Sequence, residues 1–303
     1  MMSTTVSRNA PTSLLVGTGE RRARKSAGLL NRVAQQTGWP ILLLAAGIVL
    51  IAIFANVLSP HDPLAGSLRD RLVPPFTTSE FPLGTDPLGR DMLSRLMYGA
   101  RISLAVGFSA VALGMVVGSL LGLIAGYVGG WPDAVLMRAA DAQLSLPSFI
   151  LALTIMAALG SGLFNVILAL SIGSWVRYAR VVRSMVLPLR ETEYVLAAQT
   201  IGCAPNRVMR RHVMPNVVTP VIILATLGLG TTIIAESSLS FLGLGVDPES
   251  PSWGSMLSEG RAYLDSAWWV AAFPGIAITI TVLCVNLIGD ALRDQLDPQT
   301  MRR

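Results

Sequence analysis

The chain has 303 residues, of which 52% are hydrophobic and only 14% are charged, and its mean hydropathy is +0.59. Soluble domains carry about 25% charged residues, so the composition excludes an ordinary soluble protein and predicts one that spans a membrane. The only lysine, Lys25, lacks the Gly-rich frame of a P-loop. The chain therefore does not bind ATP phosphates by that route. We expect membrane lipid, and no nucleic acid, among its partners.

Long apolar segments predict the fold. A helix of about 20 apolar residues is long enough to cross a bilayer, and Gly160 and Gly162 divide one run that is too long for a single helix. The fold class that we predict is an all-α integral membrane protein. Its six transmembrane helices are expected at residues 39–58, 102–132, 134–159, 162–187, 213–246 and 266–289.

The distribution of arginine predicts the orientation. Basic residues gather in the N-terminal segment 1–38, in the stretch 177–215 and in the tail 291–303. They are scarcer in the segments 60–99 and 247–266. Because short cytosolic loops are enriched in Lys and Arg, we place both termini in the cytosol and the last two segments outside. The core of five helices is expected over 100–290.

The polar segment 190–216 lies between two long apolar stretches and reads as two short helices. Tyr194–Ile201 is the first, Gly202 ends it, and Ala204–His212 follows and stops before Pro215. A membrane protein that keeps so organised a loop outside the bilayer indicates a docking element. The residues alone leave open that nothing docks there.

A glycine recurs at every fourth position of the second predicted span. Small residues at this spacing allow two helix backbones to approach closely in lipid. We predict a packing seam, either within this chain or against a second subunit, at Gly114, Gly118, Gly122 and Gly126.

Charged residues inside or beside the spans are candidates for a transport path or a gate, because burying a charge in a membrane is costly. Glu236 either lines a polar path or bonds to the serines beside it. Arg177, Arg180 and Arg183 share one helix face, where they either anchor the helix end or act in gating. Asp141 is expected to pair with the arginine one turn before it.

Two outer segments are rich in turns and either cap a pore or meet an outside partner. Asp91 precedes Arg95 by one helical turn, which predicts a short helix at the membrane surface. The residues that we select as facing an external binding protein are Asp86, Arg90, Asp91 and Trp253.

Catalysis within the membrane is disfavoured by the scarcity of histidine. The chain has two, His61 and His212, and neither lies in a predicted span. An intramembrane Ser/His protease, a His-ligated metal site and a haem-bearing helix pair all lack their ligands. We expect no catalytic residue, no metal and no cofactor in this chain.

The loop resembles the cytosolic signature of the membrane permeases of bacterial ABC importers. That signature reads Glu-Ala-Ala, three residues, Gly, nine residues, Ile, one residue, Leu-Pro. Ala197, Ala198 and Gly202 match, and Pro215 takes the proline position. His212 stands at the isoleucine position, as in the peptide and nickel subfamily.

Leu196 stands where the signature has its glutamate, and Glu193 is the candidate to replace the salt bridge of that residue. The resemblance implies that the loop receives the ATPase subunits. The positions that it assigns to this contact are Glu193, Tyr194, Ala197, Ala198, Gly202, Arg207, His212 and Pro215.

Three further motifs are similar to the second, C-type permease of dipeptide and oligopeptide importers. They are Gly84-Thr-Asp-Pro-Leu-Gly-Arg-Asp-Met-Leu-Ser-Arg95, Ser238-Leu-Ser-Phe-Leu-Gly-Leu-Gly245 with Pro251-Ser-Trp-Gly-Ser-Met-Leu257, and Gly289-Asp-Ala-Leu-Arg-Asp-Gln-Leu-Asp-Pro298. The resemblance covers roughly residues 39–298 and implies a type I ABC importer permease fold in a bacterial inner membrane.

The implied assembly has four kinds of subunit. This chain would pair with a homologous B-type permease, two ATPase subunits would bind ATP and Mg, and an extracytoplasmic protein would deliver the peptide. Within the resemblance, nickel or glutathione is the alternative substrate. From a different class, a stand-alone secondary transporter or channel would use the same spans without needing a docking loop.

Overall fold

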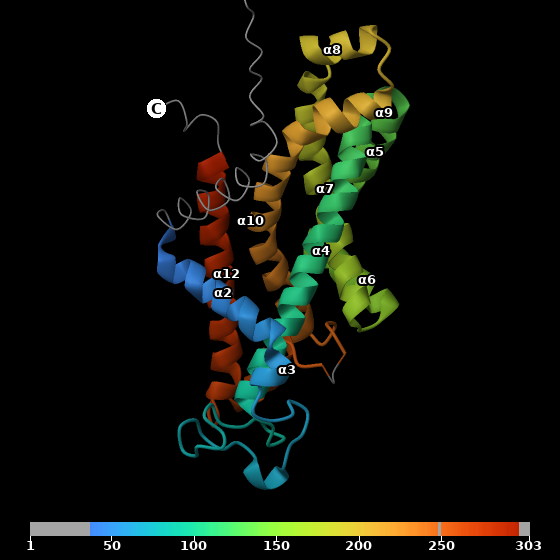
Figure 1. Ribbon diagram of the computed structural model, residues 1–303. Helices are drawn as coiled ribbons and strands as arrows, with labels where there is room; N and C mark the ends of the chain where they lie inside the picture. The colour runs from blue at the N-terminus through green and yellow to red at the C-terminus, as the bar shows by residue number, and fades with distance from the viewer. Residues whose placement is uncertain (1–36, 248–249, 297–303) are drawn as a thin grey trace, which may run out of the picture.

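The computed structural model describes residues 37–247 and 250–296, and these fold into a long bundle of helices (Figure 1). Residues 1–36, 248–249 and 297–303 lie outside the described residues, so the N-terminal segment and most of the tail are not tested. Helix α8 (Glu193–Thr200) lies at one end of the bundle, and the segment 59–91 lies at the other. Helix α11 (Trp253–Gly260) belongs to the second end, which we call the α11 end.

Long helices and several shorter ones make up the bundle. Their bounds are α2 Trp39–Ile53, α3 Ala55–Leu58, α4 Met92–Val128, α5 Gly130–Leu144, α6 Ser148–Leu159, α7 Leu163–Leu189, α9 Pro205–Val208, α10 Met214–Phe241 and α12 Trp269–Leu296. The all-helical prediction is confirmed for the described residues.

Within the described residues, three helices are long and apolar enough to cross a membrane, and the bent α5–α6 pair would make a fourth span. The three are Met92–Val128, Pro205–Phe241 and Trp269–Leu296. Of the other two predicted spans, α2 has 15 residues, and α7 carries three arginines in its second half.

Helix α4 begins at Met92, ten residues before the predicted span at 102–132, so the predicted start of that helix is wrong. Asp91 is its N-cap, and its carboxylate accepts hydrogen bonds from the backbone N–H groups of Leu93 (3.2 Å) and Ser94 (3.0 Å). These bonds satisfy two of the free donors at a helix start. The separate surface helix predicted from Asp91 and Arg95 is therefore the first turn of α4.

The predicted helix 134–159 is broken into α5 and α6, which meet at 89°. Pro147 causes the break, because proline has no N–H and forces the residue before it out of the helical region. The break predicted at Gly160 and Gly162 is confirmed, since both adopt positive φ, 82° and 148°.

Helix α4 packs against α7 of the same chain along the predicted glycine stripe. A Cβ atom at Gly118 would lie 2.3 Å from the carbonyl oxygen of Trp175, and one at Gly122 would lie 2.4 Å from that of Ala179. Gly114 and Gly126 face α7 in the same way. Of the two interpretations left open by the sequence, the structure selects packing within the chain.

The second helix of the 190–216 loop does not stop before Pro215, contrary to the prediction. Helix α9 continues through a π-helical turn, Met209–Val213, into α10, and the Met214 N–H bonds to the Met209 carbonyl. Pro215 lies in the first turn of α10. Proline has no N–H and would interrupt the hydrogen bonds of a regular α-helix. The wider π-helical turn accommodates Pro215 at the start of α10.

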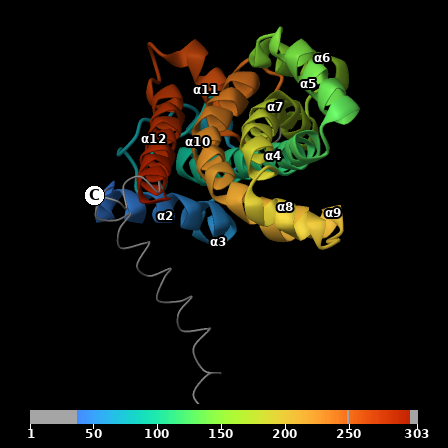
Figure 2. The same cartoon turned by 90° about the horizontal axis from the view of Figure 1, so that it is seen from above.

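Two close contacts of α10 join it to α12 and to α4. Gly230 of α10 lies against Asn286 of α12, and Gly107 of α4 lies against Ile233 of α10. Helix α2 packs on α4 and α12, and Figure 2 shows it on the outside of the bundle.

The glycine seam predicts a sharp difference between two Gly→Ala substitutions. Gly118→Ala places a methyl group against the α7 backbone, and such overpacking costs about 1–3 kcal/mol. Gly47→Ala in α2 is the control, because a Cβ there meets no atom within 4 Å. We expect Gly118→Ala to lower the thermal unfolding midpoint of the purified protein by several degrees, with Gly47→Ala at or above wild type. Equal midpoints would contradict the seam.

Candidate functional site

Helix α8 is fixed to the bundle by a small apolar cluster. Val195 and Ala198 on its inner face pack with Val208 of α9, and Tyr127 and Cys203 border them. Ala198 is 7% exposed. Of the two alanines that the resemblance assigns to the ATPase contact, Ala198 is thus buried and Ala197 is exposed.

Gly202 ends α8 by reversing the chain. Its φ is 82°, its N–H bonds to Gln199 (2.9 Å), and the N–H of Cys203 bonds back to the carbonyl of Ala198 (3.0 Å). These two bonds form a Schellman motif, which needs a left-handed residue at this position. No atom lies within 4 Å of a Cβ built on Gly202, so glycine is required here by backbone conformation and not by lack of space.

Further contacts join this loop to α4, α7 and α10. The rings of Tyr194 and His212 lie 6.1 Å apart, and Gln199 donates to the hydroxyl of Tyr127 at 3.3 Å. Arg190, at the end of α7, donates to the carbonyl of Gly126 in α4 at 3.2 Å. The loop is therefore an ordered extension of the α4–α7 pair.

The loop exposes apolar and charged side chains. Tyr194, Leu196 and Ile201 are 45%, 48% and 80% exposed. Exposed apolar side chains beside polar ones are found at protein interaction sites. Other exposed positions of the loop include Glu193, Ala197, Gly202, Arg207, Arg211 and Pro215.

Two of the three arginines on α7 pair with aspartates of α5. Arg183 binds Asp133 with two bonds, of 2.5 and 2.7 Å, and Arg180 forms an ion pair with Asp141. The prediction that Asp141 pairs within its own helix is thus wrong. This exposed ion pair links α5 to α7.

Arg177 lines a cavity between α6, α7 and α10, whereas Arg180 and Arg183 do not. It forms no hydrogen bond or ion pair that the described residues supply. Of the predicted path residues, Arg177 alone lines this cavity.

Glu236 is fully buried and surrounded by serine hydroxyls, which is the second of the two alternatives for it. Its carboxylate accepts hydrogen bonds from Ser240 (2.8 Å) and Ser237 (3.3 Å). The hydroxyls of Ser103 in α4 and Ser252 before α11 also bond to it. It therefore ties three elements together and does not line a path.

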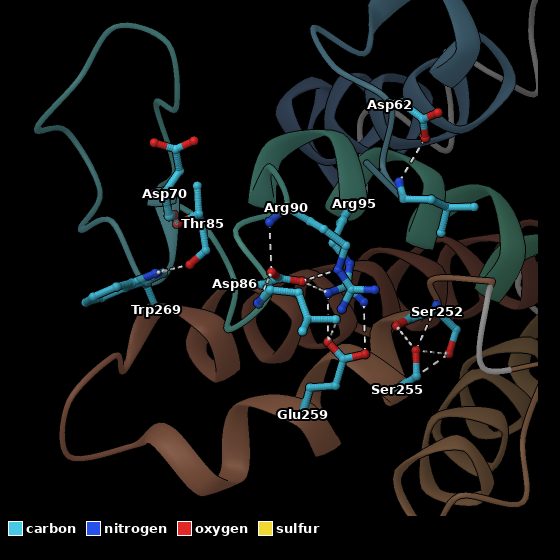
Figure 3. A network of polar contacts seen from close by, with 12 residues as sticks. Asp62, Asp70, Thr85, Asp86, Arg90, Arg95, Ser252, Ser255, Glu259 and Trp269 are labelled. Carbon is cyan, nitrogen blue, oxygen red and sulfur yellow. Dashed lines mark hydrogen bonds and ion pairs between the residues drawn. The ribbon is translucent and has the colours of Figure 1, made fainter. Parts of the chain in front are cut away.

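A buried network of charges holds the segment 59–91 to α11 (Figure 3). Asp86 has no exposed surface. It accepts from Arg90 Nε at 2.5 Å and from Arg95. Arg95 in turn donates to both oxygens of Glu259 in α11, at 2.7 and 3.0 Å. Buried charges persist only when paired and hydrogen-bonded, so this network is a structural joint.

The residues selected as facing an external partner are mostly inside the molecule, and that prediction is wrong. Asp86 and Asp91 are buried, Trp253 is 2% exposed and donates to the Leu96 carbonyl at 3.0 Å, and the Arg90 side chain is 12% exposed. The segment around Trp253, read as turns, contains α11, which starts at a capping box of Ser252 and Ser255.

Comparison with known proteins shows the family to which the chain belongs. The family model described as binding-protein-dependent transport system inner membrane component matches residues 118–302. The matched residues include the glycine seam from Gly118 onward, the α8–α9 loop, Glu236 of α10 and the whole of α11. The chain belongs to this family.

Relatives in the family share most of their length with the chain. It is 44% identical to the dipeptide transport system permease protein DppC of Alkalihalophilus pseudofirmus, covering 85% of this chain and 84% of that protein. It is 44% identical to the di/tripeptide permease DppC of Pseudomonas aeruginosa, over 85% and 86%. It is 42% identical to the glutathione permease GsiD of Pectobacterium atrosepticum, over 89% and 88%.

A solved structure shows the same fold. The inward-facing MetNI methionine ABC transporter aligns with a TM-score of 0.55 at 19% identity, covering 68% of this chain and 98% of the matched chain. At this identity the likeness shows the fold alone.

Sequence reasoning missed the residues that hold the loop and the outer segment in place. Tyr127 and Arg190 lie outside the signature, and Glu259 lies outside the quoted motifs. The spacing of Val195 and Ala198, three residues apart, was an available sign that one face of α8 is buried.

Because the carboxylate of Glu236 is buried and hydrogen-bonded, we predict that removing it lowers the stability of the protein and leaves transport by the folded fraction intact. Glu236→Ala leaves several serine hydroxyls without their acceptor, at about 1–3 kcal/mol for each unsatisfied group. Glu236→Gln is the control, since an amide still bonds to hydroxyls. We expect Glu236→Ala to lower the unfolding midpoint and yield, and the fraction that folds to transport normally. A normal midpoint with lost transport would instead place Glu236 in the path.

Proposed function

We propose that this chain is a permease subunit of an ATP-driven peptide importer and forms half of its translocation path. The observation that carries the proposal is the ordered α8–α9 loop, with its exposed apolar side chains, in a member of this permease family. The relatives named as dipeptide, di/tripeptide and glutathione permeases support a peptide as substrate. Glutathione, itself a tripeptide, is the alternative.

The topology that we propose has six spans with both termini in the cytosol of a bacterium that carries the complex in its inner membrane. The alternation of the connections supports it. The turn at Gly129 and the α8–α9 loop lie at one end. The turn at Gly162, which bonds to Gly245, and the Arg95–Glu259 joint lie at the other. Arginine-rich segments favour the α8 end as cytosolic.

In this proposal the α8–α9 loop receives ATPase subunits, which bind ATP and Mg, and the chain itself carries no catalytic residue or cofactor. The exposed apolar side chains of Tyr194, Leu196 and Ile201 supply apolar contact area. The exposed Arg207 and Arg211 supply charged contacts. Leu196 then contributes apolar area at the position where the signature has an acid.

A homologous B-type permease would complete the path, and an extracytoplasmic binding protein would deliver the peptide to the α11 end. The surface for that delivery differs from the one that the sequence predicted. Leu68 and Phe76 are 75% and 80% exposed at this end. Exposed apolar side chains of this kind suit a partner better than the buried Asp86 and Trp253.

Reconstitution tests the proposal against a stand-alone transporter. The complete set of subunits, encoded with this chain, is placed in proteoliposomes, and uptake of labelled trialanine is followed. We expect uptake only with ATP, the ATPase subunits and the binding protein all present. Uptake by this chain alone, driven by an ion gradient, would establish a secondary transporter instead.

The packing of α8 yields a second test, of the loop itself. Ala198→Leu forces a larger side chain between α8 and Val208, and Gly202→Pro demands a φ near about −65° where the chain has 82°. Both are expected to lower trialanine uptake at least tenfold and to reduce copurification of the ATPase subunits, while the chain still inserts. Ala134→Leu, at an exposed position of α5, is the control and should transport normally. Normal uptake in Ala198→Leu would contradict the docking assignment.

A further inference from the structure

A cavity of about 120 Å³ lies between α6, α7 and α10, in the middle part of the bundle. Its polar lining consists of Ser148, Ser174, Arg177, Tyr178, Thr231 and Thr232. No Asp or Glu lines it. A cavity of this size admits several water molecules or a small polar group, so Arg177 is a cation in a polar space without a counter-charge.

Arg177 stands near the centre of α7, which runs from Leu163 to Leu189. At about 1.5 Å per residue it lies about 20 Å from either end of the helix. In the proposed topology α7 crosses the bilayer, where a charged side chain near the middle of the helix is costly unless it faces a wet cavity or a partner. Arg180 and Arg183, one and two turns further on, both have aspartate partners. Arg177 has none among the described residues.

Three hydroxyl groups of the cavity donate their protons within their own helices. Thr231 and Thr232 each donate to the Gly228 carbonyl at 2.8 Å, and Ser174 donates to Ser171 at 3.2 Å. A hydroxyl oxygen that has donated its proton still accepts hydrogen bonds. The cavity therefore offers a guanidinium donor on α7 and hydroxyl acceptors on α7 and α10.

We propose that this cavity is a substrate contact within the path, in which Arg177 binds the C-terminal carboxylate of the passing peptide. The planar guanidinium matches a carboxylate with two parallel hydrogen bonds. The hydroxyls of Thr231 and Thr232 accept from peptide N–H groups. The inference rests on the proposed function and adds that the permease selects for a free carboxyl end.

The first experiment uses the complete importer in proteoliposomes at saturating binding protein. Arg177→Gln is expected to lower the amount of trialanine imported per ATP hydrolysed at least tenfold, and Arg177→Lys, which keeps the charge but loses the fork, to lower it less. Arg138→Gln, at an exposed position of α5, should match wild type. An unchanged ratio in Arg177→Gln would overturn the proposal and leave the proposed function intact.

Chemical rescue separates a need for charge from a need for structure. Arg177→Cys is made in a background in which Cys203 and Cys284, the free cysteines of the described chain, are replaced by alanine. Aminoethyl methanethiosulfonate restores a cation at this position, and propyl methanethiosulfonate adds a neutral group of similar reach. We expect import per ATP to return by at least threefold with the cationic reagent and not with the neutral one.

Equal responses to the two reagents would overturn the carboxylate contact. So would loss of the second permease from the purified Arg177→Gln complex, because Arg177 would then pair with an acidic residue across the subunit interface. If the wild-type assembly imports no trialanine in the presence of ATP, the proposed function itself fails. That result is distinct from a variant-specific loss.

Discussion

The close approach of the α4 and α7 backbones is the constraint on which the rest of the structure depends. Lipid supplies no hydrophobic force between helices, so association relies on close packing and on bonds between helices. Every fourth residue of α4 from Gly114 to Gly126 is glycine, and the facing surface is α7 backbone or its first side-chain atoms. A single methyl group at these positions would separate the two helices.

This pair determines what is found at each end of the bundle. Helix α4 has 37 residues, about 55 Å at 1.5 Å per residue. At one end, Tyr127 and Arg190 connect the pair to the α8–α9 loop. At the other, Arg95 connects α4 through Glu259 to α11. Rigid packed elements of this kind transmit a displacement from one site to another, which is what a subunit driven by an ATPase requires.

The sequence predicts those parts of the fold that depend on local pattern. Apolar length identifies the three helices that are long enough to cross a membrane, the glycine stripe identifies a packing face, and paired glycines mark the turn before α7. The loop signature also identifies an ordered segment, with Gly202 at the end of α8. Pro147 was an available sign of the bend between α5 and α6, because the residue before a proline avoids the helical region.

Pairing between distant residues could not be predicted in the same way. Asp91 and Arg95 have the spacing of a helical ion pair, yet Asp91 caps the helix and Arg95 bonds to Glu259, 164 positions away. Asp141 likewise pairs with α7. Charge and spacing describe only the neighbours along the helix, whereas burial selects partners from other elements. The four residues expected on the outer surface are mostly inside for this reason.

The central claim is that the α8–α9 loop, fixed to the end of the α4–α7 pair, is where an ATPase subunit docks. Site-specific photocrosslinking in the assembled importer tests it most directly, with a benzophenone amino acid at Ile201, which is 80% exposed, and at the buried Val208 as control. The account predicts a crosslink from position 201 to an ATPase subunit and none from position 208. An importer that copurifies intact but gives no ATPase crosslink from position 201 would contradict it.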